Sequence, residues 1–220
     1  MNDKTKPPKF NEVPFLKVKI PENLYSEIKK VYSTAKFSEK VNENEYSKEY
    51  KTVVCGGISV KNSIKPYYYR NEISQDLFDL CYDEITPIVE EWSKVKLERS
   101  WGYGIRSYIK NSVLHLHRDR IDTHIISCII YIDQKSNQNW PLDFYDHDNN
   151  HHQVYFEDGD MLLYESLCVH GRETPFNGEY YRNMYVHWKP KEWDPTPYNN
   201  MKTDFLNGNH LKNFYPVVKS

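Results

Sequence analysis

The pattern of apolar residues changes near Leu97, and this change constrains the fold more than any other feature of the chain. Before Leu97, apolar residues recur at helical spacing in two segments. After Leu97, they recur with period two in short segments separated by turns rich in Gly, Asp and Asn. Short strands without intervening helices are typical of a double-sheet β core and not of βαβ units. Seven segments are predicted to be strands: Trp101–Ile109, Val113–His117, Ile125–Ile132, Leu142–Asp146, Gln153–Phe156, Met161–Tyr164 and Tyr181–Lys189.

The N-terminal part is predicted to support this core. A short strand at Phe15–Ile20 precedes a helix that begins at Pro21, and a longer helix spans Ile73–Val95 with a kink at Pro87. The charged stretch Glu39–Lys51 indicates a solvated loop or a mobile helix. We therefore predict one mainly β domain with supporting helices. Its parts are a loose N-terminus (1–12), a strand with supporting helices (13–99), the β core (100–190) and a C-terminal extension (191–220).

Composition excludes several classes of protein. The 29 basic and 31 acidic residues give a net charge of −2, so the chain lacks the positive charge expected of a nucleic-acid-binding protein. The most apolar run, Ile125–Ile132, is much shorter than the roughly 20 residues that cross a membrane. No secretory signal follows the charged N-terminus, which predicts a cytoplasmic protein. The cysteines form no C-x-x-C pair and are expected to be free thiols: Cys55, Cys81, Cys128 and Cys168.

The strongest chemical signal is the sequence His117-Arg118-Asp119, followed 53 residues later by His170. Residues i and i+2 of a strand point to the same side, so His117 and Asp119 can offer an imidazole and a carboxylate to one metal ion. His170, which follows another predicted strand, supplies a third ligand. Two histidines and one carboxylate with open positions are the ligand set of non-heme Fe(II) oxygenases.

A 2-oxo acid that chelates such an iron needs a partner for its distant carboxylate, because an unpaired charge inside a barrel is costly. Arg182 on the last predicted strand is the leading candidate. Tyr108 and Tyr131 lie on flanking predicted strands, where their hydroxyls would donate to the same carboxylate. The opposing interpretation is that Arg182 is exposed and that both tyrosines belong to the core.

The stretch from Trp101 to Pro190 resembles the double-stranded β-helix of the 2-oxoglutarate- and Fe(II)-dependent oxygenases, nearest the prolyl 4-hydroxylase-like branch. The resemblance rests on the motif His117-Arg118-Asp119-Arg120 and on four further segments: Arg106-Ser107-Tyr108, Tyr131-Ile132-Asp133, Asp158–Ser166 and His170-Gly171-Arg172. It implies a jelly-roll or cupin-like core flanked by N-terminal helices, with Fe(II) at His117, Asp119 and His170. It also implies 2-oxoglutarate near Tyr108 and Tyr131, with a basic residue on the last strand.

What the resemblance implies for the reaction is hydroxylation of a prolyl or other peptidyl residue with O2, giving succinate and CO2, with ascorbate as an optional reductant. The substrate is then a peptide or protein, although a small molecule fits the same chemistry. The family's basic residue usually lies nine or ten residues after the distal histidine, where this chain has Glu179 and Tyr180. Arg182 is offset from that position, and Arg172 is therefore the reserve candidate.

Two other functions remain open. A cupin-like Zn²⁺ or Mn²⁺ hydrolase or isomerase would use His115, His117 and His170, because zinc favours sets rich in histidine. A non-enzymatic binding module would use no metal. The other histidines have structural interpretations: His124 lies beside the metal-binding segment, and His147, His151 and His152 belong to a solvated turn.

Overall fold

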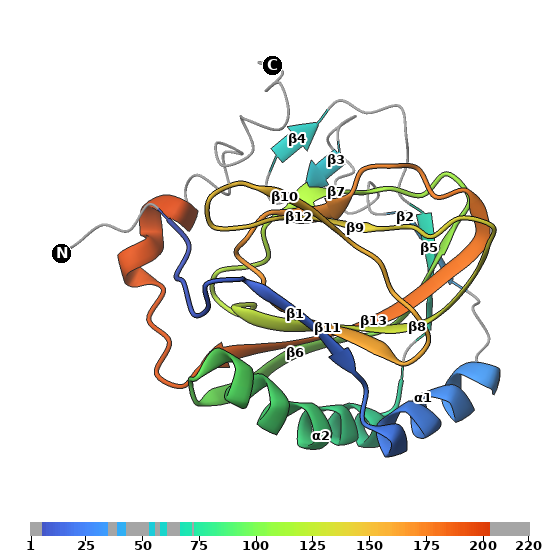
Figure 1. The fold of residues 1–220 in the computed structure, drawn as a ribbon, viewed down its shortest axis with the longest axis horizontal. Helices are drawn as coiled ribbons and strands as arrows, with labels where there is room; N and C mark the ends of the chain where they lie inside the picture. The colour runs from blue at the N-terminus through green and yellow to red at the C-terminus, as the bar shows by residue number, and fades with distance from the viewer. Residues whose placement is uncertain are drawn as a thin grey trace.

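The computed structural model describes residues 6–34, 39–42, 53–55, 58–60, 67–71 and 73–202. It has three layers: a smaller sheet, a larger sheet, and two helices on the outer side of the larger sheet (Figure 1). The helices are α1 (Glu22–Thr34) and α2 (Gln75–Ser93), and a short 3-10 helix, η2, spans Thr196–Tyr198. No helix in the described part of the chain is long and apolar enough to cross a membrane.

Both sheets are antiparallel. The larger sheet has the order β1 (Phe15–Lys19), β11 (Asp160–Glu165), β8 (Ile126–Ser136), β13 (Gly178–Pro190), β6 (Leu97–Ile109), β5 (Tyr67–Asn71) and β2 (Glu39–Asn42). The smaller sheet has the order β10 (His151–Val154), β9 (Leu142–Tyr145), β12 (His170–Arg172) and β7 (Leu114–His117). A separate hairpin pairs β3 (Val53–Cys55) with β4 (Ile58–Val60). The predicted fold class, a jelly-roll-like β core with N-terminal helices, is confirmed.

Two predictions about local structure were wrong. The segment Glu39–Lys51, predicted to be a loop or helix, contains the strand β2, which pairs with β5 at the edge of the larger sheet. An edge strand needs backbone partners on only one side, so a charged sequence without apolar alternation can form it. The prediction also lacked β12, whose three residues with Gly171 in the middle are too few to show a period.

The central strands are buried on both faces, which explains why their sequences are apolar without alternation. On β13, Met184 and Trp188 belong to the core between the larger sheet and the helices. Tyr181 and Tyr185, on the opposite face, belong to the core between the two sheets. The second core is rich in aromatic residues, and it surrounds the space in which the candidate site lies.

The helix α2 has defined ends. The Ser74 hydroxyl accepts a hydrogen bond from Leu77 N at 3.2 Å, as an N-cap does. Lys94 adopts a left-handed conformation with φ of 60° and donates its N–H to Glu90 O at 2.9 Å. The helix continues through Pro87 as one element.

Both ends of the described chain contact the core. Phe10 N and Asn11 N donate hydrogen bonds to the buried Glu165 carboxylate, so this part of the segment that was predicted to be loose is anchored. At the other end, the Trp193 indole donates to Ile121 O at 2.8 Å, and its ring stacks on Tyr198. Residues 203–220 of the predicted C-terminal extension lie outside the described residues.

The edge strand β1 carries lysines that oppose pairing with another chain. Lys17 and Lys19 both lie close to the buried Asp160 carboxylate, at 3.1 and 2.6 Å. Charged side chains on an edge strand are a common protection against aggregation.

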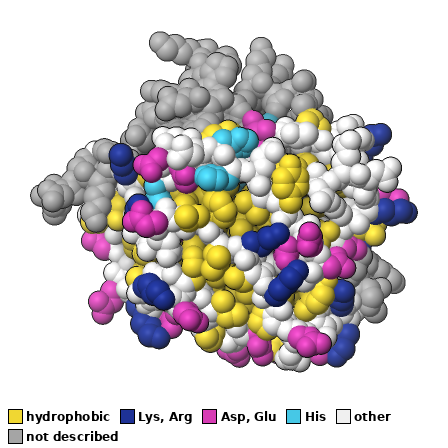
Figure 2. Space-filling model, in the orientation of Figure 1, with side chains coloured by type: hydrophobic (Ala, Val, Ile, Leu, Met, Phe, Trp, Pro, Cys, Tyr) yellow, Lys and Arg dark blue, Asp and Glu magenta, His cyan; other side chains and the backbone are white. Residues whose placement is uncertain are grey.

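Hydrophobic side chains gather in the middle of the face that carries β1, with charged groups around them (Figure 2). Leu16 is exposed, and so is Tyr155, whose backbone oxygen accepts a hydrogen bond from Lys17 Nζ.

Gly171, between His170 and Arg172, allows β12 and β7 to approach closely. A Cβ atom at this position would lie 2.6 Å from Leu114 O and 2.8 Å from His115 O. These are backbone atoms, so the strands would have to separate. We expect Gly171→Ala to lower the free energy of unfolding by about 2–3 kcal/mol, as overpacking does, in a urea titration. An unchanged midpoint would show that the two strands move apart at little cost.

Candidate metal centre

The residues His117, Asp119 and His170 meet at one end of the smaller sheet. His117 ends β7, Asp119 follows two residues later, and His170 begins β12, directly opposite His117 in the antiparallel register. Asp119 carboxylate oxygens lie 3.5 Å from His117 Nε2 and 3.9 Å from His170 Nε2. The three ligand atoms all lie within 4.8 Å of one another. In the described part of the chain, no other group of three His, Cys, Asp or Glu side chains is this close.

Backbone carbonyls orient both imidazoles. His117 Nδ1 lies 2.7 Å from His115 O, and His170 Nδ1 lies 2.9 Å from Cys168 O. A carbonyl only accepts hydrogen bonds, so in each ring Nδ1 carries the hydrogen and Nε2 carries the lone pair. Both lone pairs are therefore available to one cation, the arrangement usual for histidine ligands of a metal.

The charges of the site suit a divalent cation. Burial alone would favour a protonated Asp119, but the neighbouring His117, His170 and His187 hold the pKa of this carboxyl below its usual range. Burial lowers the pKa of His170 to about 4, so this imidazole is neutral at neutral pH. At least one neutral imidazole and one carboxylate are therefore ready to bind a metal without releasing protons.

Several residues that support Asp119 were missed in the sequence. The Tyr164 hydroxyl donates to Asp119 Oδ2 at 3.4 Å, and His187 Nδ1 lies 3.9 Å from the same oxygen. The Ser127 hydroxyl lies 2.6 Å from both His187 Nδ1 and the Ser166 hydroxyl. All four are buried in the barrel. The only sequence signal for His187 is its period-two spacing from Tyr181 and Tyr185, which places the three on one face of β13.

Arg172 and Arg182, the two candidate carboxylate partners, lie in different places. Arg172 is fully buried on the same strand as His170 and two residues from it. Its Nη2 donates to the Tyr181 hydroxyl at 2.8 Å, and its Nη1 donates to Trp140 O. The guanidinium lies 4.4–4.8 Å from the centres of the Tyr181 and Trp140 rings. Among the described residues, its Nε has no hydrogen-bond partner and no carboxylate forms an ion pair with it.

Arg182 lies on the opposite face of β13 from Tyr181, because the two residues are adjacent along the strand. Its guanidinium lies over the Tyr180 ring at 3.7 Å and 3.6 Å from Asp133 Oδ2. Its Nε donates to the Ser107 hydroxyl at 3.4 Å. Arg172 belongs to a buried group of aromatic residues, the inner cluster, which consists of Tyr108, Tyr131, Trp140, Phe156 and Tyr181. Arg182, which the sequence favoured, lies outside the inner cluster.

Tyr108 and Tyr131 both belong to the inner cluster around Arg172. The Tyr108 hydroxyl lies 3.0 Å from the Tyr185 hydroxyl, and its ring packs against Trp140. The Tyr131 ring lies 5.4 Å from that of Tyr181. Burial raises the pKa of Tyr131, and it raises the pKa of Tyr181 to about 12, so both hydroxyls stay protonated at neutral pH.

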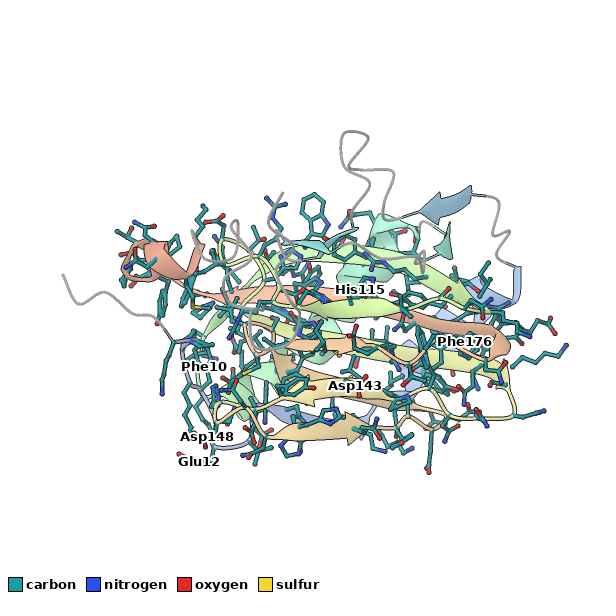
Figure 3. The ribbon with its side chains drawn as sticks, turned by 90° about the horizontal axis from the view of Figure 1, so that it is seen from above. Phe10, Glu12, His115, Asp143, Asp148 and Phe176 are labelled. Carbon is teal, nitrogen blue, oxygen red and sulfur yellow. The ribbon has the colours of Figure 1, made fainter. Side chains whose placement is uncertain are left out.

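The remaining histidines do not form a second metal group in the described structure. His115, labelled in Figure 3, is buried, and its Nδ1 lies 3.4 Å from Glu173 Oε1. The alternative zinc set with His115 in place of Asp119 is not brought together. The His124 ring lies against that of His187 in a tilted arrangement, with 3.9 Å between ring centres and 34° between ring planes. The other three each pair with a different carboxylate: His147 with Glu165, His151 with Asp143 and His152 with Asp146.

Comparison with known proteins finds likeness in structure alone. No family model matches the sequence, and no curated protein matches it. Among solved structures, AviO1 from Streptomyces viridochromogenes Tue57 has a TM-score of 0.56 at 12% identity, covering 84% of this chain and 94% of that one. HygX from Streptomyces hygroscopicus, with nickel and 2-oxoglutarate bound, has a TM-score of 0.56 at 13% identity over 84% and 87%.

A 2OG-Fe(II) oxygenase family protein from Burkholderia pseudomallei has a TM-score of 0.53 at 10% identity, covering 79% of this chain and 84% of that one. The TM-scores establish a shared fold, but sequence identities this low do not establish a shared family. The chain has the fold of 2-oxoglutarate- and Fe(II)-dependent oxygenases. Its own residues place two histidines and an aspartate together inside that fold.

Proposed function

We propose that this chain is an Fe(II)- and 2-oxoglutarate-dependent dioxygenase that hydroxylates an organic substrate and forms succinate and CO2. The observation that carries the proposal is the meeting of His117, Asp119 and His170 at one end of the barrel. Two imidazoles and one carboxylate leave positions of an iron ion open, which this chemistry requires. The structural similarity to HygX, crystallised with 2-oxoglutarate, supports the same proposal.

The surroundings of Arg172 fit the distal carboxylate of 2-oxoglutarate. A buried guanidinium without an anion is costly, and the described contacts of Arg172 are all to neutral groups. Its Nε–H is available to a carboxylate oxygen. We propose that Arg172 binds this carboxylate, with Tyr108 and Tyr131 as nearby hydroxyl donors, and that Arg182 has no part in it.

In this function, His117, Asp119 and His170 would hold the iron, which when bound supplies the activation of O2 coupled to oxidation of the 2-oxo acid. The protein would position the cosubstrate and keep water away from the reacting groups. Arg172 orients the cosubstrate along the barrel, and the aromatic core excludes water from the reacting groups. The Tyr164 hydroxyl and the His187 ring keep the Asp119 carboxylate in one orientation.

For the substrate, we propose a prolyl or other peptidyl residue. Trp101 on β6 is 55% exposed, and its ring lies 6.4 Å from that of Tyr103. The Tyr103 ring in turn lies 5.6 Å from His187, next to Asp119. Aromatic surfaces of this kind bind proline-containing peptides. A small-molecule substrate is the second candidate, because one HygX structure contains hygromycin B.

The test begins under anaerobic conditions with Fe(II), followed by 2-oxoglutarate. We expect a weak visible charge-transfer band only after both additions. Oxygen is then admitted with either proline-containing peptides or hygromycin B, and succinate and product mass are measured. A mass gain of one oxygen in a peptide supports peptidyl hydroxylation, and one in hygromycin B supports the second candidate. No band, together with zinc binding that requires His115, would instead support a cupin-like zinc enzyme.

A further inference from the structure

Residues 165–169, from the last residue of β11 through the turn that leads to β12, contact two of the candidate metal ligands and are called the turn 165–169. Asp119 N donates a hydrogen bond to Ser166 O at 2.9 Å. His170 Nδ1 lies 2.9 Å from Cys168 O. Any shift of this turn would therefore move the Asp119 backbone and rotate the His170 ring. The positions of Asp119 and His170 therefore depend on the contacts that hold this turn in place.

Glu165 joins the start of this turn to the N-terminal segment. Its side chain is 3% exposed. The carboxylate accepts a hydrogen bond from Asn11 N at 2.7 Å and from Phe10 N at 3.2 Å. Its own backbone N–H donates to Pro14 O at 2.9 Å. The N-terminal segment thus contacts both the backbone and the side chain of one residue, and holds it in place.

His147 contacts the same turn from the loop between β9 and β10. Its Nε2 lies 3.0 Å from Glu165 Oε2, and its Nδ1 lies 3.7 Å from Cys168 Sγ. The His147 ring therefore lies between the Glu165 carboxyl group and the Cys168 thiol. In Figure 3, Phe10, Glu12 and Asp148, the residue that follows His147, all lie toward the same end of the molecule. The ring therefore links the first and fourth residues of the turn.

We propose that Glu165 is a positioning residue for the metal centre. It clamps the turn 165–169 between the N-terminal segment and His147, and the turn then orients Asp119 and His170 through its carbonyls. The inference rests on the proposed function, because it assigns a role toward a bound metal. Nothing in the sequence pattern indicated this role, since the clamp joins residues about 155 positions apart.

The test measures metal affinity, with Fe(II) under anaerobic conditions or Co(II) as the probe. We expect Glu165→Ala to weaken binding about 10- to 100-fold, the effect usual for residues behind a metal ligand, and to alter the visible spectrum of bound Co(II). Glu165→Gln keeps one oxygen for Asn11 N and should recover part of the affinity. Glu12→Gln is the control, because the side chain of Glu12 is exposed and pairs with Lys9.

The outcomes separate this inference from the proposed function. If the unmodified protein binds neither metal, the proposed function fails. If it binds metal and the folded Glu165→Ala variant has the same affinity and Co(II) spectrum, only the role of Glu165 is overturned. Should Glu165→Ala fail to fold, Glu165→Gln decides: a weaker affinity at an unchanged melting temperature supports the role, and an unchanged affinity refutes it.

Discussion

Asp119→Ala is expected to abolish the Fe(II)–2-oxoglutarate charge-transfer band and to weaken metal binding by at least about 100-fold. Loss of a residue that hydrogen-bonds to a metal ligand typically weakens metal binding roughly 10- to 100-fold. The loss expected here is larger, because the variant removes the only carboxylate of the three-residue group. Isothermal titration with Fe(II) under anaerobic conditions measures the affinity. Removing Asp119 also removes the negative charge next to the half-buried His117 and the buried His170, so the effect is not confined to one bond.

Asp143→Asn is the matched control for this variant. Asp143 is also a buried carboxylate on the smaller sheet, but it accepts hydrogen bonds from His151 and Glu173 N. Its loss should change stability and leave metal affinity within about threefold. Retained Fe(II) binding in Asp119→Ala would place the metal elsewhere. Retained succinate formation in that variant would contradict the proposed reaction itself.

Arg172→Met is expected to weaken 2-oxoglutarate binding by about 30- to 5,000-fold while leaving Fe(II) affinity nearly unchanged. Loss of one partner of a buried charged pair costs about 2–5 kcal/mol, which corresponds to this range. The charge-transfer band, titrated with 2-oxoglutarate at saturating Fe(II), reports the affinity. Arg182→Met is the control and should stay within about threefold, because Arg182 contacts Tyr180 and Asp133 outside the inner cluster.

A cosubstrate analogue makes this prediction specific. The acid 2-oxopentanoate has the same chelating groups but lacks the distal carboxylate. The unmodified protein should prefer 2-oxoglutarate strongly, and Arg172→Met should lose that preference. If Arg172→Met binds both acids more weakly by the same factor, Arg172 is a structural residue of the aromatic cluster. If Arg182→Met loses the preference instead, the assignment of the two arginines is reversed.

The meeting of the candidate metal ligands was predictable because its signal is local. His117 and Asp119 are two residues apart, and the period of a strand fixes their common side whatever the rest of the fold does. His170 needed only a preceding strand to place it at the same end of the barrel. The strand β2, at the edge of the larger sheet, was less predictable. Its sequence is charged, and its pairing with β5 is made by backbone groups, so its side chains show no period-two alternation of apolar residues.

The choice between Arg172 and Arg182 shows where sequence reasoning stops. Alternation assigns faces only when one face is polar, and β13 is buried on both faces between Met184 and Trp188. A register shift between Arg182 and Asn183 further changes the pairing with β8. Which arginine lies inside was therefore decided by the packing of Tyr181 and Trp140 around Arg172.

The sequence by itself determined the class of fold, the strand that ends at His117 and the choice of His117, Asp119 and His170 as candidate metal ligands, because each depends on a short local pattern. Only the tertiary structure decided how the ligands are supported. Tyr164 and His187 contact Asp119 across separations of 45 and 68 residues, and Asn11 donates to Glu165 across 154 residues. Contacts over such separations form only when the sheets pack, and no local period records them.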